Sequence, residues 1–144
     1  MKNVYLDNSA TTKTDEEVVK AMFPYLSDNY GNPSSIYSIG QTARKAVEES
    51  RETVASILNC SPNEIYFTSG GSESDNTIIK GIAYSYKNKG NHIITSKIEH
   101  PAVLETCKQL EKEGFEVSYI NVDANGIVDL KELQEAITPS TILI

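Results

Sequence analysis

The chain has 144 residues, a formal net charge of −7 and a hydrophobic content of 39%. This length and apolar content fit one globular α/β domain with a single core. The acidic balance, without any basic run, argues against nucleic acid or a membrane surface as the main partner. The apolar runs are short and strand-like, so we predict neither a transmembrane helix nor a secretory signal and expect a cytoplasmic setting.

Two cysteines, Cys60 and Cys107, are too few for a disulfide framework. In a cytoplasmic setting we expect both thiols to be free. We predict no metal site in this sequence.

The N-terminal part of the chain is predicted to be helical after a polar loop. Small polar residues at 7–12 suit the lining of a site or a solvated loop. A helix is predicted from about residue 15 to about 27, with Thr14 as N-cap in a capping box. Pro24 falls inside this window and predicts a kink or an early end.

A loop and a long helix are predicted next. Turn formers at 30–35 indicate a loop over the surface or over a site. Apolar residues then recur at helical spacing from about residue 39 to about 58.

The stretch 67–76 (FTSGGSESDN) places a glycine pair between a strand-like run at 64–68 and a helical pattern that begins at Glu73. The first N–H groups of a helix at such a turn point at any anion that lies there, and Ser72 adds a hydroxyl. The pattern predicts a phosphate cradle. A tight connection with Ser72 as helix N-cap is an equally weighted alternative. The glycine spacing matches neither a Walker loop nor a GxGxxG motif.

The second half of the chain alternates strands and helices. Strands are predicted at 92–95 and 115–120, and a last one begins at 141. A helix from Pro101 to Lys112 is bounded by a proline in its first turn and by Gly114 beyond its end. A further short helix begins near Asp129.

This alternation predicts a doubly wound, mostly parallel α/β sheet of four strands centred near Tyr66, Ile94, Val117 and Ile142. Ligands of such sheets lie beyond the carboxyl ends of the strands, where 69–72 and 96–100 fall. We divide the chain into an N-terminal segment with a site-lining loop (1–14), a helical region (15–60) and an incomplete cofactor-binding α/β domain (61–144). Because the sequence stops within an apolar strand, we expect it to be a fragment of a longer protein.

Four ordered motifs strongly resemble the cysteine desulfurases of the NifS/IscS type. They are YLDNSATT at 5–12, GNPSS at 31–35, FTSGGSESDN at 67–76 and TSKIEH at 95–100. The likeness continues through TCKQLE at 106–111 and NGIVDL at 125–130.

The resemblance implies a pyridoxal-phosphate enzyme of aminotransferase class V, with the aspartate-aminotransferase-like fold and a homodimeric assembly. Gly71 and Ser72 match the pair that binds the cofactor phosphate, although the family usually has Ala-Thr there. His100 matches the catalytic histidine that stacks on the pyridine ring. Without the motif, His100 reads as a helix N-cap or a surface histidine, and His92 has only that interpretation. Asn8, Thr11 and Asn32 are further candidates for lining the site, without assigned roles.

The reaction that the resemblance implies converts L-cysteine to L-alanine and leaves sulfur on an enzyme cysteine, for iron–sulfur cluster or thiolated-cofactor assembly. The family's Schiff-base lysine and sulfur-accepting cysteine correspond to positions beyond residue 144, so we expect the 144-residue chain alone to be inactive. Cys60 and Cys107 are interpreted as structural thiols. The implied partners are L-cysteine and a sulfur-acceptor or scaffold protein.

Three alternatives remain open at this point. One is another class V enzyme, such as a selenocysteine lyase. Another is a non-catalytic interaction or scaffold fragment that retains only the anion site. A small nucleotide-binding domain of doubly wound type is the weakest, because neither recognised glycine motif is present.

Overall fold

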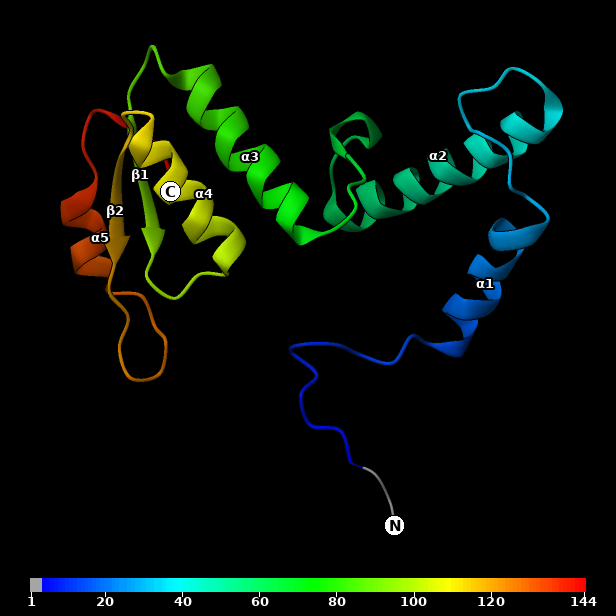
Figure 1. The fold of residues 1–144 in the computed structure, drawn as a ribbon, viewed down its shortest axis with the longest axis horizontal. Helices are drawn as coiled ribbons and strands as arrows, with labels where there is room; N and C mark the ends of the chain where they lie inside the picture. The colour runs from blue at the N-terminus through cyan, green and yellow to red at the C-terminus, as the bar shows by residue number, and fades with distance from the viewer. Residues whose placement is uncertain (1–3) are drawn as a thin grey trace. The chain divides into compact units, whose positions relative to one another are not determined.

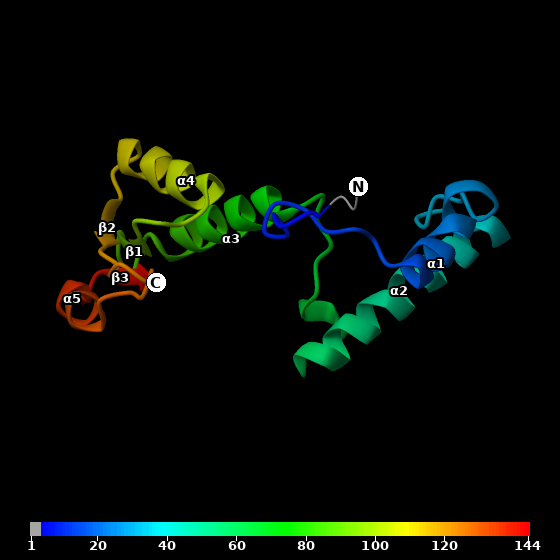
Figure 2. The same ribbon diagram turned by 90° about the horizontal axis from the view of Figure 1, so that it is seen from below.

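A computed structural model describes residues 4–144 and divides the chain into two units, Met1–Tyr66 and Phe67–Ile144. The first three residues of the predicted segment 1–14 lie outside the described residues. Figures 1 and 2 show the elements of each unit.

From residue 4 onward, the first unit has the α-helices α1 (Glu16–Ser27) and α2 (Ser38–Leu58) and the short 3-10 helix η1 (Pro62–Glu64). The Asp15 carboxylate accepts a hydrogen bond from the Glu17 N–H at 2.8 Å, so Asp15 is the N-cap of α1. The prediction of Thr14 was therefore wrong by one residue, because a carboxylate at the next position occupies the cap. Pro24 lies inside α1 without ending it.

The loop before α2 packs tightly on the start of that helix. A Cβ at Gly31 would collide with the Ile39 carbonyl, and one at Gly40 would lie 2.7 Å from the Asn32 carbonyl oxygen. At its other end, α2 stops at Asn59, which has the left-handed φ of 53° that commonly terminates a helix.

The predicted strand at 64–68 is not formed. Glu64 ends η1, and the residues after it are irregular, with Tyr66 82% exposed. A strand needs a neighbour for its backbone groups, and the three strands of the described chain pair only with one another. The sheet therefore has three strands where four were predicted.

The second unit is an α/β arrangement, which confirms the predicted fold class. Its elements run in the order α3 (Gly71–Tyr86), β1 (His92–Ser96), α4 (Pro101–Lys112), β2 (Glu116–Ile120), α5 (Leu130–Ala136) and β3 (Thr141–Leu143). Both pairings of β1 are parallel, and the strand order is β2-β1-β3. Figure 2 shows α4 and α5 on opposite sides of the strands.

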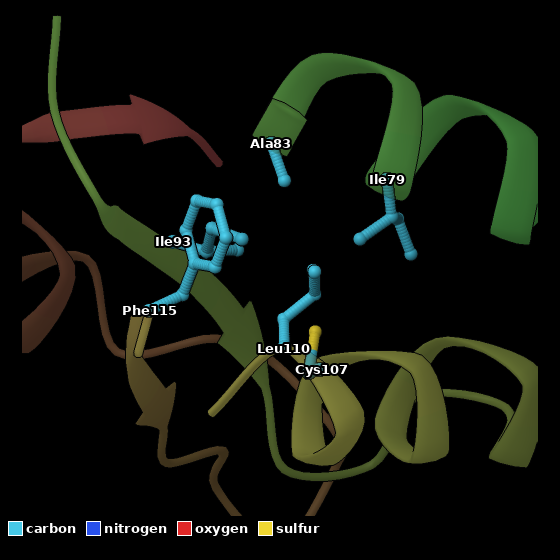
Figure 3. Close-up of a cluster of buried hydrophobic side chains, with 6 residues drawn as sticks. All are labelled: Ile79, Ala83, Ile93, Cys107, Leu110 and Phe115. Carbon is cyan, nitrogen blue, oxygen red and sulfur yellow. The ribbon is translucent and has the colours of Figure 1, made fainter. Parts of the chain in front are cut away.

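The core of the second unit lies between the α3–α4 pair and β1, as Figure 3 shows. It consists of six buried side chains: Ile79, Ala83, Ile93, Cys107, Leu110 and Phe115. Leu110 is 0% exposed and Ile93 1%. This packing fixes α3 and α4 against the sheet, and therefore also fixes the loops at their N-terminal ends.

His92 is buried in the sheet, contrary to its interpretation as a surface or N-cap histidine. It is 5% exposed, its Nδ1 lies 2.8 Å from the Thr141 hydroxyl and its Nε2 lies 2.9 Å from the Ser118 hydroxyl. Hydroxyl partners on both neighbouring strands satisfy both ring nitrogens, which lets a polar ring lie inside the sheet.

Candidate functional site

The glycine pair forms the start of α3. Gly70 is the N-cap, no side chain caps this end within the described chain, and the first helical bond runs from the Ser74 N–H to the Gly70 carbonyl at 3.2 Å. The N–H groups of Gly71, Ser72 and Glu73 are therefore those that a helix cannot satisfy internally. Ser72 lies inside the helix, so the alternative that made it the N-cap is wrong.

The first residues of this helix end, Gly70 and Gly71, carry no side chains. A Cβ built on Gly70 or Gly71 meets no atom within 4 Å. Gly70 has φ 163° and ψ 177°, an extended backbone that any residue can adopt. The conformation thus does not require glycine, and the absence of side chains leaves the helix end accessible to an anion.

Glu73 organises the turn before α3. Its Oε2 accepts hydrogen bonds from the Ser69 hydroxyl and from the Ser69 N–H, both at 2.7 Å. These two donors hold the pKa of the Glu73 carboxyl below its usual value. Glu73 had no predicted role; its position four residues after Ser69, at the start of the helix, is the sequence signal for this contact.

The Thr68 hydroxyl closes the same turn. It lies 2.7 Å from the Ser74 hydroxyl and 3.2 Å from the Gly70 carbonyl oxygen. The side chains of Glu73 and Thr68 thus hold the turn. None of their hydrogen bonds uses the N–H groups of Gly71, Ser72 or Glu73.

His100 caps the next helix. Its Nδ1 accepts a hydrogen bond from the Ala102 N–H at 3.1 Å, which makes it the N-cap of α4. This is the alternative interpretation of His100, and it is compatible with a ring-stacking role because it engages one edge of the imidazole and leaves the faces accessible. With Nδ1 accepting, the neutral ring carries its proton on Nε2.

The starts of α3 and α4 lie at the same edge of the sheet. Both helices run antiparallel to β1 and pack against one another, so their N-terminal ends lie where β1 ends (Figure 1). The structure therefore brings Gly71, Ser72 and His100 to the carboxyl edge of the strands, where a doubly wound sheet binds its ligands.

A cavity of about 400 Å³ lies at this edge, with mainly apolar walls. Its lining includes Asp75, Ile78, Ser96, Val103, Ile120 and Leu143. None of Gly71, Ser72 and His100 lines it. The cavity is thus a hollow beside the core of the second unit that reaches Asp75 of α3 and Glu99 before α4.

The three suspected residues of the first unit make local contacts. The Asn32 side-chain oxygen accepts from the Ser34 N–H at 2.9 Å, and the Thr11 hydroxyl lies 2.8 Å from the Tyr5 hydroxyl. Asn8 lies in an exposed turn whose Asp7 carbonyl accepts from the Ala10 N–H at 3.1 Å. These bonds explain their local conformations and assign them no chemistry.

Neither cysteine has the surroundings of a nucleophile. Both are free, and Cys107 is buried in the core, where burial raises the pKa of its thiol. Cys60 follows the end of α2 and is half-buried. Among the described residues, no helix could span a membrane and no group of His, Cys, Asp and Glu is placed to hold a metal ion.

Comparison with known protein families shows the family to which the chain belongs. The aminotransferase class-V profile matches residues 4–144. The chain belongs to the aminotransferase class-V family. Members of this family, including the cysteine desulfurases, are pyridoxal-phosphate enzymes.

Relatives within this family are cysteine desulfurases. The chain is 58% identical over 143 residues to the cysteine desulfurase IscS of Methanosarcina thermophila and 56% identical to that of Clostridium botulinum. Each match covers 99% of this chain but only 35% and 36% of the relative. The chain thus spans about a third of the length of the curated relatives it matches.

Solved structures agree with this family. A NifS-like protein matches with a TM-score of 0.93 and 44% identity over 97% of this chain and 38% of its own. SspA in complex with cysteine matches with a TM-score of 0.88 and 41% identity over 95% of this chain and 40% of its own. The chain therefore has part of the α/β fold of the large domain of aspartate-aminotransferase-like enzymes.

The residues of this class V chain fit the phosphate of the cofactor. A helix end without a side-chain cap, which begins with two glycines, suits a dianion, and the Ser72 hydroxyl makes no hydrogen bond within the described chain. The small Gly-Ser pair keeps the features of the family's usual Ala-Thr pair: a small residue followed by a hydroxyl.

Proposed function

We propose that this chain is the N-terminal, cofactor-phosphate-binding part of a pyridoxal-phosphate-dependent cysteine desulfurase. The observation that supports it is the uncapped start of α3 at the same sheet edge as His100. The identity to cysteine desulfurases over nearly the whole chain supports the substrate class.

In this proposal Gly71 and Ser72 hold the cofactor phosphate through backbone N–H groups and one hydroxyl. The positive end of the α3 dipole adds to this attraction. Glu73 is bonded back to Ser69, so its carboxylate does not fold onto the N–H groups that the phosphate needs.

His100 is the residue that faces the cofactor ring. Its cap bond to Ala102 fixes the ring orientation and keeps the proton of the neutral form on Nε2. Pyridoxal phosphate, when bound, supplies an electron sink for bonds at the substrate's α-carbon. The His100 Nε2–H is then available as a donor at the edge of the site.

The proposed reaction converts L-cysteine to L-alanine and transfers sulfur to an enzyme cysteine, for iron–sulfur cluster or thiolated-cofactor assembly. A structure similar to this chain was determined in complex with cysteine. A sulfur-acceptor or scaffold protein and a homodimeric assembly complete the proposal. A cytoplasmic location agrees with two free thiols.

The 144-residue chain alone is proposed to be inactive. Cys107 is buried in the core and therefore unsuited to accept sulfur. Lys97, the lysine nearest to His100 in sequence, is bonded to Asn121 through its Nζ at 2.6 Å.

The phosphate assignment is tested by following backbone amide NMR signals during titration with pyridoxal phosphate, pyridoxal and inorganic phosphate. We expect the two phosphate-bearing ligands to shift the signals of Gly71, Ser72 and Glu73, and pyridoxal to leave them unchanged. Ser72→Ala should weaken phosphate binding roughly fivefold, the effect of one lost hydrogen bond. Ser85→Ala, at the other end of α3, is the matched control. Equal shifts with pyridoxal, or shifts centred elsewhere, would contradict the assignment.

Inactivity of the chain alone is tested with L-cysteine and pyridoxal phosphate, with alanine as the readout and intact mass after borohydride reduction as a second one. We expect no alanine and no added cofactor mass. Reducible attachment at a single site would show that a lysine of this chain holds the cofactor, and the inactive-part proposal would fail.

A further inference from the structure

The loop 97–100 between β1 and α4 carries His100. Successive residues of this loop make hydrogen bonds or packing contacts with neighbouring segments. Before the loop, the buried Ser96 donates through its hydroxyl to the Glu99 Oε1 at 2.8 Å. At its end, the His100 Nδ1 accepts from the Ala102 N–H. A connection of this kind is usually the mobile part of a fold, so this density of contacts calls for a physical reason.

Lys97 connects the loop to the end of the neighbouring strand. Its backbone N–H donates to the Ile120 carbonyl at 3.0 Å, which extends the parallel ladder by one residue. Its Nζ donates to the Asn121 Oδ1 at 2.6 Å. Lys97 therefore joins the exits of β1 and β2 through both its backbone and its side chain.

Asn121 has only one orientation available for this bond. Its Nδ2 and its backbone N–H donate to the two oxygens of the Glu132 carboxylate at 2.9 and 3.0 Å. With the amide nitrogen committed to Glu132, the Oδ1 faces Lys97. Glu132 lies in the first turn of α5, and the Asp129 N–H donates to the Asn121 carbonyl at 3.1 Å, so the network is anchored on a third element.

The middle of the loop contacts the β2–α5 connection. A Cβ built on Gly126 would lie 3.7 Å from the Ile98 Cδ1, so the Ile98 side chain lies beside Gly126. Gly126 has a φ of 80°, which favours glycine. The Asp123 Oδ1 accepts from the N–H groups of Asn125 and Ile127 at 2.8 and 2.9 Å and fixes this turn.

We propose that Lys97 is a positioning residue: through Asn121 and Glu132 it fixes the β1–α4 loop so that His100 keeps one ring orientation and its bond to Ala102. A lone exposed lysine contributes little to stability, so its effect should be local. The purpose of this positioning rests on the proposed function, whereas the positioning itself is measurable without any cofactor.

The test uses the cofactor-free 144-residue chain, with NMR of the two histidine rings and of the Ala102 amide. We expect wild type to show one set of His100 ring signals with the proton on Nε2. Lys97→Met should split or broaden that set and speed hydrogen exchange at the Ala102 amide roughly fivefold, as loss of a cap does. Asn121→Leu, which removes the acceptor of the Lys97 ammonium, should do the same.

Two variants separate positioning from a general loss of stability. Lys97→Arg keeps a donor for Asn121 and should retain the wild-type His100 signals. Lys108→Met removes an ammonium–carboxylate contact of the same 2.6 Å length, to Glu105 on the surface of α4, and should leave His100 unchanged. His92 is the internal reference, because both its nitrogens are bonded within the sheet.

Unchanged His100 signals in Lys97→Met would overturn the proposal. Equal disturbance of His92 and His100, or failure of Lys97→Arg to retain the signals, would overturn it as well, because each would indicate a general structural role. The phosphate titration has a different readout at α3, so failure of the proposed function is recognised separately.

Discussion

The two units use similar sequence patterns with different results. In the second unit the apolar faces of α3 and α4 are buried against β1. In the first unit α1 has an equally clear apolar stripe, but it buries none of its residues, and Phe23 and Leu26 are 63% and 75% exposed. The buried residues of α2 are small: Gly40, Ala43 and Ala55.

This comparison separates helix formation from tertiary stability. Capping and periodicity are enough to place both α1 and α4 in sequence. Only α4 also has a sheet to cover, and burial of apolar surface provides most of the stability of a helix in a protein. We therefore expect cooperative unfolding of the second unit and weak resistance to unfolding in the first.

The largest expected difference comes from removing one leucine side chain in each unit. Leu110→Ala should lower the free energy of unfolding of the second unit by about 2–5 kcal/mol, because it leaves a cavity in a fully buried site. Leu58 lies in the first unit and is 63% exposed. Leu58→Ala should therefore change the free energy of unfolding of the chain by less than about 0.5 kcal/mol. Urea titration followed by circular dichroism measures both. Equal effects would show that the units do not differ as described.

A smaller difference in stability is expected when the N-cap residue of one helix in each unit is replaced. In both helices this residue is an aspartate. The Asp129 Oδ1 accepts from the Lys131 N–H at 2.9 Å, and the Asp15 Oδ1 accepts from the Glu17 N–H at 2.8 Å. Asp129→Ala should lower the unfolding free energy of the second unit by about 1 kcal/mol. Asp15→Ala should reduce helicity around α1 and leave the main urea transition in place. A shift of that transition by Asp15→Ala would show that α1 contributes to the cooperative core.

The smallest effect concerns alkaline pH. Burial, and then the hydrogen bond from its hydroxyl to Glu111, raise the pKa of Tyr119 to about 12 from the usual 10.0. Because the folded pKa lies above the unfolded one, this stabilisation is complete below about pH 10 and is lost as the pH rises toward 12. Tyr119→Phe should reduce the decline in stability over this range. Tyr37→Phe, in the first unit, should not change it; melting temperatures at several alkaline pH values decide between these outcomes.

Every predicted helix formed, and three of the four predicted strands formed within about a residue of their predicted limits. The helix Pro101–Lys112 was placed at both ends, because a proline in the first turn and a glycine beyond the last mark its limits locally. The strand at 64–68 failed because a strand depends on a partner that sequence does not name. The interpretation of His92 as a surface or N-cap histidine was wrong for the same reason: its hydroxyl partners, Ser118 and Thr141, lie on other strands.

The candidate site was predicted in part. The motif around Gly71 placed the start of α3 to within two residues, because the turn and the helix that follows are local features. The bond between Lys97 and Asn121 spans 24 residues and links two strand ends, and no pattern in the sequence joins those positions. Contacts of this kind require the sheet register, which only the fold supplies.

The two hydrogen bonds of His92 also select one alignment of the sheet over its competitors. Thr141 is the direct partner of His92 across β1 and β3, and Ser118 faces Ile94 two residues further along β2. A slip of either strand by one residue would turn its hydroxyl to the opposite face and leave a ring nitrogen buried without a partner. The His92 imidazole thus disfavours, during folding, any sheet in which either β2 or β3 is out of register with β1.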